Sequence, residues 1–113
     1  MAIPSGSGTE ILGKFSGSLA TTSNTTIFTV PAHHIYTIIS FSICRDGGTA
    51  TNITVRVNDG TADRVLLVEE ELKNNTFIWN DRIVLMPGNI FKMQPGGTAS
   101  MQYWISYIDQ DWT

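Results

Sequence analysis

The stretch Thr26-Ile-Phe-Thr-Val-Pro-Ala-His-His-Ile-Tyr-Thr-Ile-Ile-Ser-Phe-Ser-Ile-Cys44 contains two runs of β-branched and aromatic residues that are joined at Pro31. Proline fixes φ and lacks a backbone N–H, so the first run ends there, and the small Ala32 lets the chain reverse. The stretch Ile83-Val-Leu-Met-Pro-Gly-Asn-Ile-Phe-Lys-Met-Gln94 repeats this arrangement around Pro87. Both stretches therefore predict β-hairpins.

Runs of this kind recur along the whole chain, and no window keeps helical periodicity for about ten residues. We expect strands at Ile11–Leu19, Thr25–Val30, Ile35–Cys44, Asn52–Asn58, Arg64–Glu69, Phe77–Trp79, Ile83–Leu85, Ile90–Gln94 and Met101–Ile108. Gly13 and Gly17 weaken the first run, which is typical of an edge strand. Eight or nine short strands at this spacing predict an all-β, single-domain antiparallel β-sandwich.

The composition indicates a surface that contacts protein. The chain has 113 residues, of which 42% are hydrophobic and only 15% charged, whereas charged residues approach about a quarter of a typical soluble domain. A net charge of −3 provides no basic field for nucleic acid. No apolar run reaches the roughly 20 residues that span a bilayer, so we expect neither nucleic acid nor membrane as a partner. Residues 1–10 are expected to form a flexible N-terminal arm and residues 11–113 the sandwich domain.

Two predicted strands are apolar on both faces. In Ile35–Cys44, strict alternation places Ile35, Thr37, Ile39, Phe41 and Ile43 on one face and Tyr36, Ile38, Ser40, Ser42 and Cys44 on the other. In Met101–Ile108, aromatic residues occupy both faces. A two-layer sandwich covers one face of each sheet, so a partner subunit is expected to cover the rest. The candidate residues for an oligomer or capsid interface are Ile3, Pro4, Tyr36, Ile38, Trp104, Ile108 and Trp112.

The sequence contains no strong motif for catalysis or metal binding. The single Cys44 excludes an intrachain disulfide and is read as a small apolar residue at a strand end, because free cysteine is usually buried. Adjacent residues of an extended segment point in opposite directions, so His33 and His34 of one chain do not share an ion, although a ring of one histidine per subunit remains an alternative. No Gly-x-Ser-x-Gly nucleophile motif occurs. We therefore expect no enzyme activity, no cofactor and no metal site.

The acidic and aromatic residues can also be explained without a binding site. Glu69–Glu71 is expected to be a solvated patch, and Asp109-Gln-Asp111 a polar tail, because neither has the ligand number or turn glycine of a calcium loop. The tryptophans and tyrosines permit a sugar-stacking surface, but aromatics in strands more often belong to a core or an interface.

Three segments together resemble a group of small tailed-phage virion proteins. They are Ile27–Ile38, Arg64–Val68 and Ile83–Met93, in which the group has a Thr-Val-Pro-Ala-Gly-Lys hairpin, a middle strand and a Leu-x-Pro-Gly-Asp hairpin. The likeness covers roughly residues 25–108. This chain departs from the group at its turns, with His33-His34 in place of Gly-Lys and Gly88-Asn89 in place of Gly-Asp.

The resemblance implies a jelly-roll-like fold and a structural role. It implies a capsid decoration (cement) protein or a small head or tail accessory protein. We expect the decoration protein, which acts as a homo-oligomer, with a trimer as the expected form, and binds across neighbouring copies of the major capsid protein. It would be assembled in the host cytoplasm and reside in the virion. The alternative is a carbohydrate- or receptor-binding module of a phage tail or head fibre.

Overall fold

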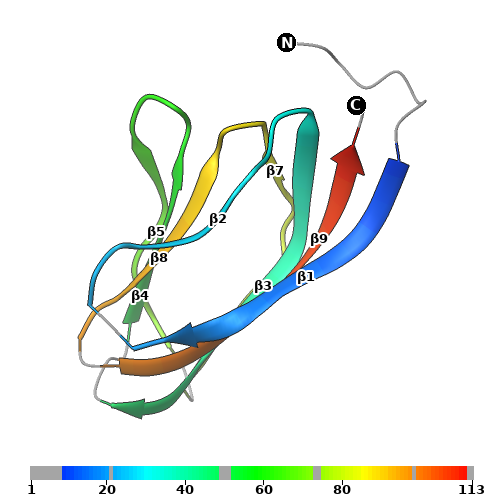
Figure 1. The fold of residues 1–113 in the computed structure, drawn as a ribbon. Helices are drawn as coiled ribbons and strands as arrows, with labels where there is room; N and C mark the ends of the chain where they lie inside the picture. The colour runs from blue at the N-terminus through cyan, green and yellow to red at the C-terminus, as the bar shows by residue number, and fades with distance from the viewer. Residues whose placement is uncertain (1–8, 21, 49–51, 73–74, 98, 112–113) are drawn as a thin grey trace.

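The computed structural model describes residues 9–20, 22–48, 52–72, 75–97 and 99–111, which fold into two packed β-sheets (Figure 1). The strands of this described part are β1 (Thr9–Leu19), β2 (Thr25–Thr29), β3 (His34–Gly48), β4 (Asn52–Asn58), β5 (Asp63–Glu71), β6 (Thr76–Trp79), β7 (Ile83–Leu85), β8 (Ile90–Pro95) and β9 (Ala99–Asp111). No helix among these residues is long and apolar enough to cross a membrane.

The strand order is that of a jelly roll. One sheet has the order β1-β9-β3-β6, with β7 also paired to β3, and the other has the order β2-β8-β4-β5. We call them the β1 sheet and the β2 sheet. Every pairing is antiparallel, and most neighbours are far apart in sequence, as in the Greek-key connections of jelly rolls. The predicted all-β sandwich is confirmed, with strand positions close to those expected.

The two proline turns, at Pro31 and at Pro87, meet in space. The Val30 N–H donates to the Asn89 carbonyl, and the Gly88 N–H donates to the Val30 carbonyl, both at 2.9 Å. Gly88 has φ 85°, a backbone conformation that a side chain would strain, and the Asn89 side chain accepts a hydrogen bond from the Met86 N–H. The two turns therefore fix each other at one end of the sandwich.

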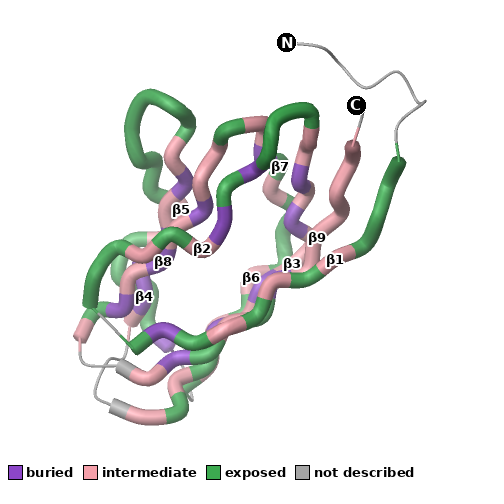
Figure 2. Tube along the Cα trace, viewed as in Figure 1, coloured by how far each residue is buried: buried purple, intermediate pink, exposed green. Residues whose placement is uncertain are grey.

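The core lies between the sheets, where buried positions of both layers face one another (Figure 2). Phe91 of β8 is at its centre, stacked on Phe28 with ring centroids 5.3 Å apart and in edge contact with Phe41 at 5.7 Å. The fully buried side chains also include Ile38, Ile43, Ile53, Val55, Leu85, Met93, Met101 and Ile105. Burying such side chains stabilises the fold by about 1.5–3 kcal/mol each, before the entropy cost of ordering the chain.

A β-bulge corrects the predicted faces of β3. The register with β9 runs through Ile38↔Tyr107 and resumes at Ser40↔Ser106, so Ile39 is an extra residue without an opposite partner. The inward side chains are consequently Tyr36 and Ile38 before the bulge and Phe41 and Ile43 after it. Strict alternation across residues 35–44 was wrong because one inserted residue exchanges the two faces.

The glycines of β1 have a packing role. Strand β1 pairs with β9 over its whole length, with Gly13 opposite Tyr107 and Gly17 opposite Tyr103. A Cβ at Gly13 would lie 2.8 Å from Tyr107 ring atoms, and one at Gly17 would lie 2.7 Å from the Tyr103 hydroxyl. The tyrosine rings therefore cover the glycines, and β1 is an edge strand, as predicted. The strand begins at Thr9, so the last two residues assigned to the arm belong to the sheet.

Candidate functional site: the outer face of the β1 sheet

The outer face of the β1 sheet has two cross-strand rows in which apolar side chains stand among small hydroxyl side chains. The first row crosses four strands. Leu12 of β1 lies opposite Ile108 of β9, which lies opposite Thr37 of β3, and Thr37 lies opposite Val84 of β7. Leu12 is 75% exposed and Val84 59%. Because alternate residues of a strand point to opposite faces, these side chains stand on the side away from the core.

The second row also crosses four strands. Ser16 of β1 lies opposite Trp104 of β9, which lies opposite Ser42 of β3, and Ser42 lies opposite Ile78 of β6. Trp104 is 51% exposed and Ile78 is 62% exposed. The Lys14 ammonium lies 4.9 Å from the centroid of the Trp104 ring, a cation–π contact from the neighbouring strand. Four large exposed hydrophobic side chains thus share one sheet face, whereas scattered single ones would need no explanation.

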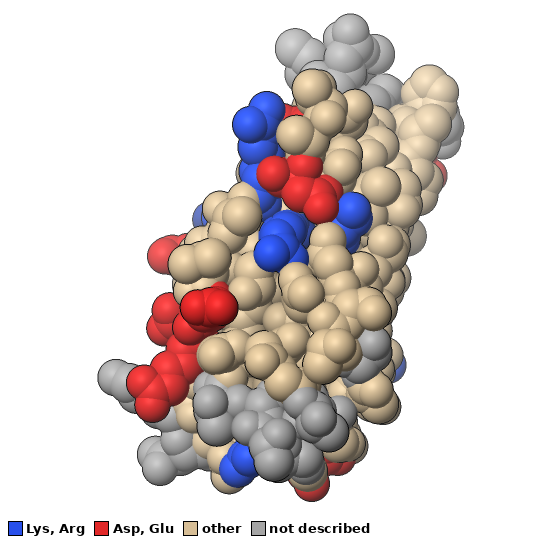
Figure 3. All heavy atoms as spheres, turned by 90° about the vertical axis from the view of Figure 1, so that its left-hand side faces the viewer, with Lys and Arg blue, Asp and Glu red and all other residues tan. Residues whose placement is uncertain are grey.

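The two outer faces differ in charge. On the strands of the β1 sheet, the outward charged side chains in the described part are Glu10 and Lys14 on the edge strand and Asp46 near the end of β3. The outer face of the β2 sheet is shown in Figure 3, where acidic and basic side chains gather. It contains the ion pair between Lys92 and Asp63 at 3.0 Å, and the hairpin that joins β4 to β5 contains a second one, between Arg64 and Asp59 at 2.9 Å. The β1 sheet therefore offers the face that is easier to desolvate.

The predicted interface residues fall into three groups. Trp104 and the half-buried Ile108 lie on this outer face. Tyr36 and Ile38 were placed wrongly at an interface, because the bulge at Ile39 turns both side chains into the core. Ile3, Pro4 and Trp112 lie outside the described residues.

Sequence reasoning missed three residues of the face, namely Leu12, Ile78 and Val84. Ile78 carried a usable signal: Phe77 and Trp79 flank it in a strand, so alternation sends Ile78 outward when its neighbours face the core. Cys44 also belongs to this face. Its side chain is exposed, not buried as expected, because β3 continues past it and residue 44 points outward beside Thr76.

His34 and the two aspartates at the end of β9 meet at one end of the sandwich. The His34 Nδ1 lies 2.7 Å from the Asp109 carboxylate, and its Nε2 lies 3.8 Å from that of Asp111. Both aspartates are part of strand β9, so the polar tail predicted for residues 109–111 is not formed. His33 lies in the turn before β3, with φ 66°. No group of three metal-ligating side chains converges within the described ranges.

The Tyr36 hydroxyl beside this pair has a strongly perturbed acidity. Burial, together with the nearby Tyr107 and Asp109, raises the pKa of Tyr36 to about 12. The folded state therefore holds this proton more tightly than the unfolded chain does, so the stabilisation is complete below pH ~10 and is lost as the pH rises towards 12.

We expect the urea midpoint to fall between pH 10 and 12 in the wild-type protein and to fall less steeply in Tyr36→Phe, which lacks the titrating hydroxyl. Denaturation curves at half-unit pH intervals measure this. Equal slopes in the two proteins would contradict the assignment.

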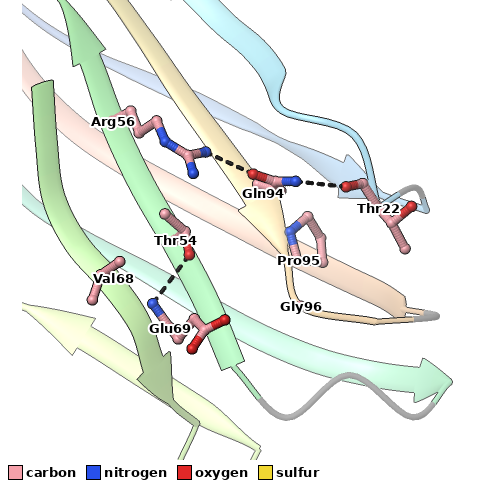
Figure 4. Close-up of a pocket in the computed structure, with 8 residues that line it drawn as sticks. All are labelled: Thr22, Thr54, Arg56, Val68, Glu69, Gln94, Pro95 and Gly96. Atoms are coloured by element: carbon pink, nitrogen blue, oxygen red, sulfur yellow. Dashed lines mark hydrogen bonds between the residues drawn. The ribbon is translucent and has the colours of Figure 1, made fainter. Parts of the chain in front are cut away.

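A polar hollow of about 380 Å³ lies on the outer face of the β2 sheet (Figure 4). Its polar groups mostly bind one another. Arg56 donates to the Gln94 side chain at 2.6 Å, Gln94 donates to the Thr22 carbonyl at 3.0 Å, and the Thr54 hydroxyl accepts from the Glu69 N–H at 3.0 Å. These contacts hold the Arg56, Gln94 and Thr54 side chains in the wall of the hollow.

Comparisons with known proteins identify the fold. No family model and no curated protein sequence matches the chain. Among solved structures, a chain from Bacillus endospore appendages, described as a novel family of disulfide-linked pili, matches with a TM-score of 0.59 and 13% identity over 100% of this chain and 97% of that one. A chain from the acid-stable capsid of Helicobacter pylori bacteriophage KHP30 matches with a TM-score of 0.56 and 7% identity, covering 89% of this chain and 92% of that one. The chain therefore has a fold that occurs in a pilus and in a phage capsid.

Proposed function

We propose that the protein is a structural subunit of a phage virion, and specifically a capsid decoration protein that attaches through the outer face of its β1 sheet. The observation that carries the proposal is the asymmetry of the two outer faces. One has few charged side chains and exposes Trp104, Ile78, Leu12 and Val84, whereas the other has the Lys92–Asp63 ion pair and exposes only the smaller Val65 and Val68. The likeness to the phage capsid chain and the sequence resemblance support the choice of a virion.

The mechanism would be burial of surface without catalysis or a cofactor. Aromatic residues at the centre of an interface contribute most of its binding energy when neighbouring side chains exclude water. Trp104 fits this description, because β1 and β3 flank it and Ile78 lies two strands away in the same row. A trimer, the oligomer expected from the sequence, would present three such faces and bind a shell by multivalency.

Replacing Trp104 with serine is expected to weaken binding to capsids that lack the protein by about tenfold, since truncating an interface anchor typically costs more than 1 kcal/mol. Ile78→Ser should act in the same direction. Val65→Ser is the matched control, because Val65 is as exposed as Trp104 but belongs to the β2 sheet. Co-sedimentation with capsids measures the affinities. Equal losses for Trp104→Ser and Val65→Ser would contradict the proposal.

A second candidate, binding of carbohydrate, rests on the surroundings of Trp104. A shallow hollow of about 360 Å³ beside the ring is lined by Ser16, Ser18 and Gln102, which supply hydroxyl and amide groups. Sugar rings stack on exposed aromatics of this kind. Titration of the free protein with glycans separates the two functions, because a decoration protein should bind capsids and should bind no glycan. Cryo-EM of decorated capsids should then show the β1 sheet against the shell.

A further inference from the structure

The edge of the β1 sheet has features of a strand-pairing site. Strand β1 is the terminal strand of its sheet in the part of the chain that the structure describes, and it pairs with β9 along all 11 residues without a register shift. Its far side therefore presents a long row of backbone donors and acceptors. Proteins normally protect such an edge with prolines, bulges, short strands or several charges. Strand β1 contains no proline and no bulge.

Two of the seven exposed large hydrophobic side chains in the described part of the chain are neighbours on this edge strand. Leu12 is 75% exposed and is the most exposed large hydrophobic residue described, and the adjacent Ile11 is 56% exposed although its side chain points inward. The only charged side chains on the strand flank this pair, Glu10 on one side and Lys14 on the other. The edge thus has an apolar centre between two opposite charges, an arrangement that is complementary to itself under two-fold symmetry.

We propose that β1 pairs antiparallel with β1 of a second copy, with the two Leu12 residues opposite each other on a two-fold axis. In this register, Glu10 of each copy lies opposite Lys14 of the other, so both charge pairs form on the outer face. Ile11 then lies opposite Gly13 of the second copy, beside the Tyr107 ring that covers that glycine. The two sheets become one continuous sheet with both cores on the same side.

Other registers are less favourable. Centring the pair on Glu10 or on Lys14 places like charges directly opposite each other, which is destabilising. Centring it on Ile11 or Gly13 leaves Glu10 and Lys14 without an opposite charge. A one-residue slip would place a side chain that faces the core of one copy opposite a side chain that faces away from the core of the other. The two cores would then lie on opposite faces of the joined sheet. Leu12 is the centre that satisfies charge and face together.

This pairing goes beyond the proposed function, because it joins copies of the chain whatever particle they belong to. A strand pair buries less than the roughly 800 Å² per partner of a standard interface, so the isolated contact should be weak. It would act at the high local concentration of an assembly, where it links subunits or trimers in pairs.

Cysteine cross-linking tests the register directly. Because the exposed Cys44 would react, the experiment starts from Cys44→Ser. In that background Leu12→Cys should form a disulfide dimer on oxidation at about 1 mM protein, since directly opposite Cα atoms lie about 4.5–5.5 Å apart, within disulfide range. The product has twice the 12.4 kDa mass of one chain on a non-reducing gel. Ser18→Cys, also at an exposed position of the same strand, should stay monomeric because its two copies lie tens of Å apart. A monomeric Leu12→Cys, or equal cross-linking at residue 18, would overturn the proposal.

Charge reversal provides a second test that does not depend on cysteine chemistry. Glu10→Lys and Lys14→Glu should each weaken the dimer by about tenfold, because each creates two like-charge pairs across the axis. The double variant Glu10→Lys/Lys14→Glu restores opposite charges and should recover wild-type affinity. Sedimentation equilibrium measures the dissociation constants, and circular dichroism confirms folding. A double variant as weak as the single ones, or single variants unchanged from wild type, would refute the pairing.

Discussion

Replacing Phe91 with alanine is expected to lower the free energy of unfolding by about 4 kcal/mol, within the 3–5 kcal/mol range of buried Phe→Ala substitutions. Phe91 has no exposed surface and contacts the rings of Phe28 and Phe41 from the two sheets. The cavity would lie between the layers, where three packed rings leave little freedom to close it. Urea denaturation at pH 7, followed by tryptophan fluorescence, measures the change.

The matched control is Val65→Ala on the same sheet, which should change stability by less than about 0.5 kcal/mol because its side chain is half exposed. Domains of this size are stabilised by about 5–15 kcal/mol, so the Phe91 variant would lose a large part of the total. A loss below about 1 kcal/mol would mean that Phe91 does not hold the two sheets together.

Strand positions could be predicted because proline, glycine and β-branched residues act locally. Pro31 and Pro87 end strands through φ and the missing N–H, whatever the rest of the chain does. The interior alternation of β9 was also predicted correctly, since Met101, Tyr103, Ile105 and Tyr107 face the core. These features need no knowledge of which strands become neighbours.

The faces of β3 could not be predicted, because a bulge depends on the partner strand. Nothing in Ile38-Ile39-Ser40 distinguishes the extra residue from its neighbours, and only the register with β9 shows it. The same error moved Tyr36 and Ile38 to a predicted interface. Leu12 was missed for a related reason: its place in the apolar row depends on pairing with Ile108, about a hundred residues away in sequence.

Replacing Gly13 with alanine is expected to destabilise the fold by about 2 kcal/mol, although glycine-to-alanine changes in strands usually help. The new Cβ would lie 2.8 Å from the Tyr107 ring, which cannot easily move because it stacks on Phe15 at 4.8 Å and packs on Tyr36 at 4.7 Å. Gly47→Ala is the control, since its Cβ would meet Ser100 at an ordinary 3.4 Å. It should be neutral or slightly stabilising.

A double-mutant cycle identifies the clash as the cause. In a Tyr107→Leu background the ring is gone, so Gly13→Ala should cost much less than in the wild type, with a coupling of about 1–2 kcal/mol. If the cost of Gly13→Ala were the same in both backgrounds, the ring would not be responsible. The strand-breaking glycines that make β1 look weak in sequence would then need another explanation. The expected coupling instead makes them the sites at which an edge strand accepts the tyrosines of its neighbour.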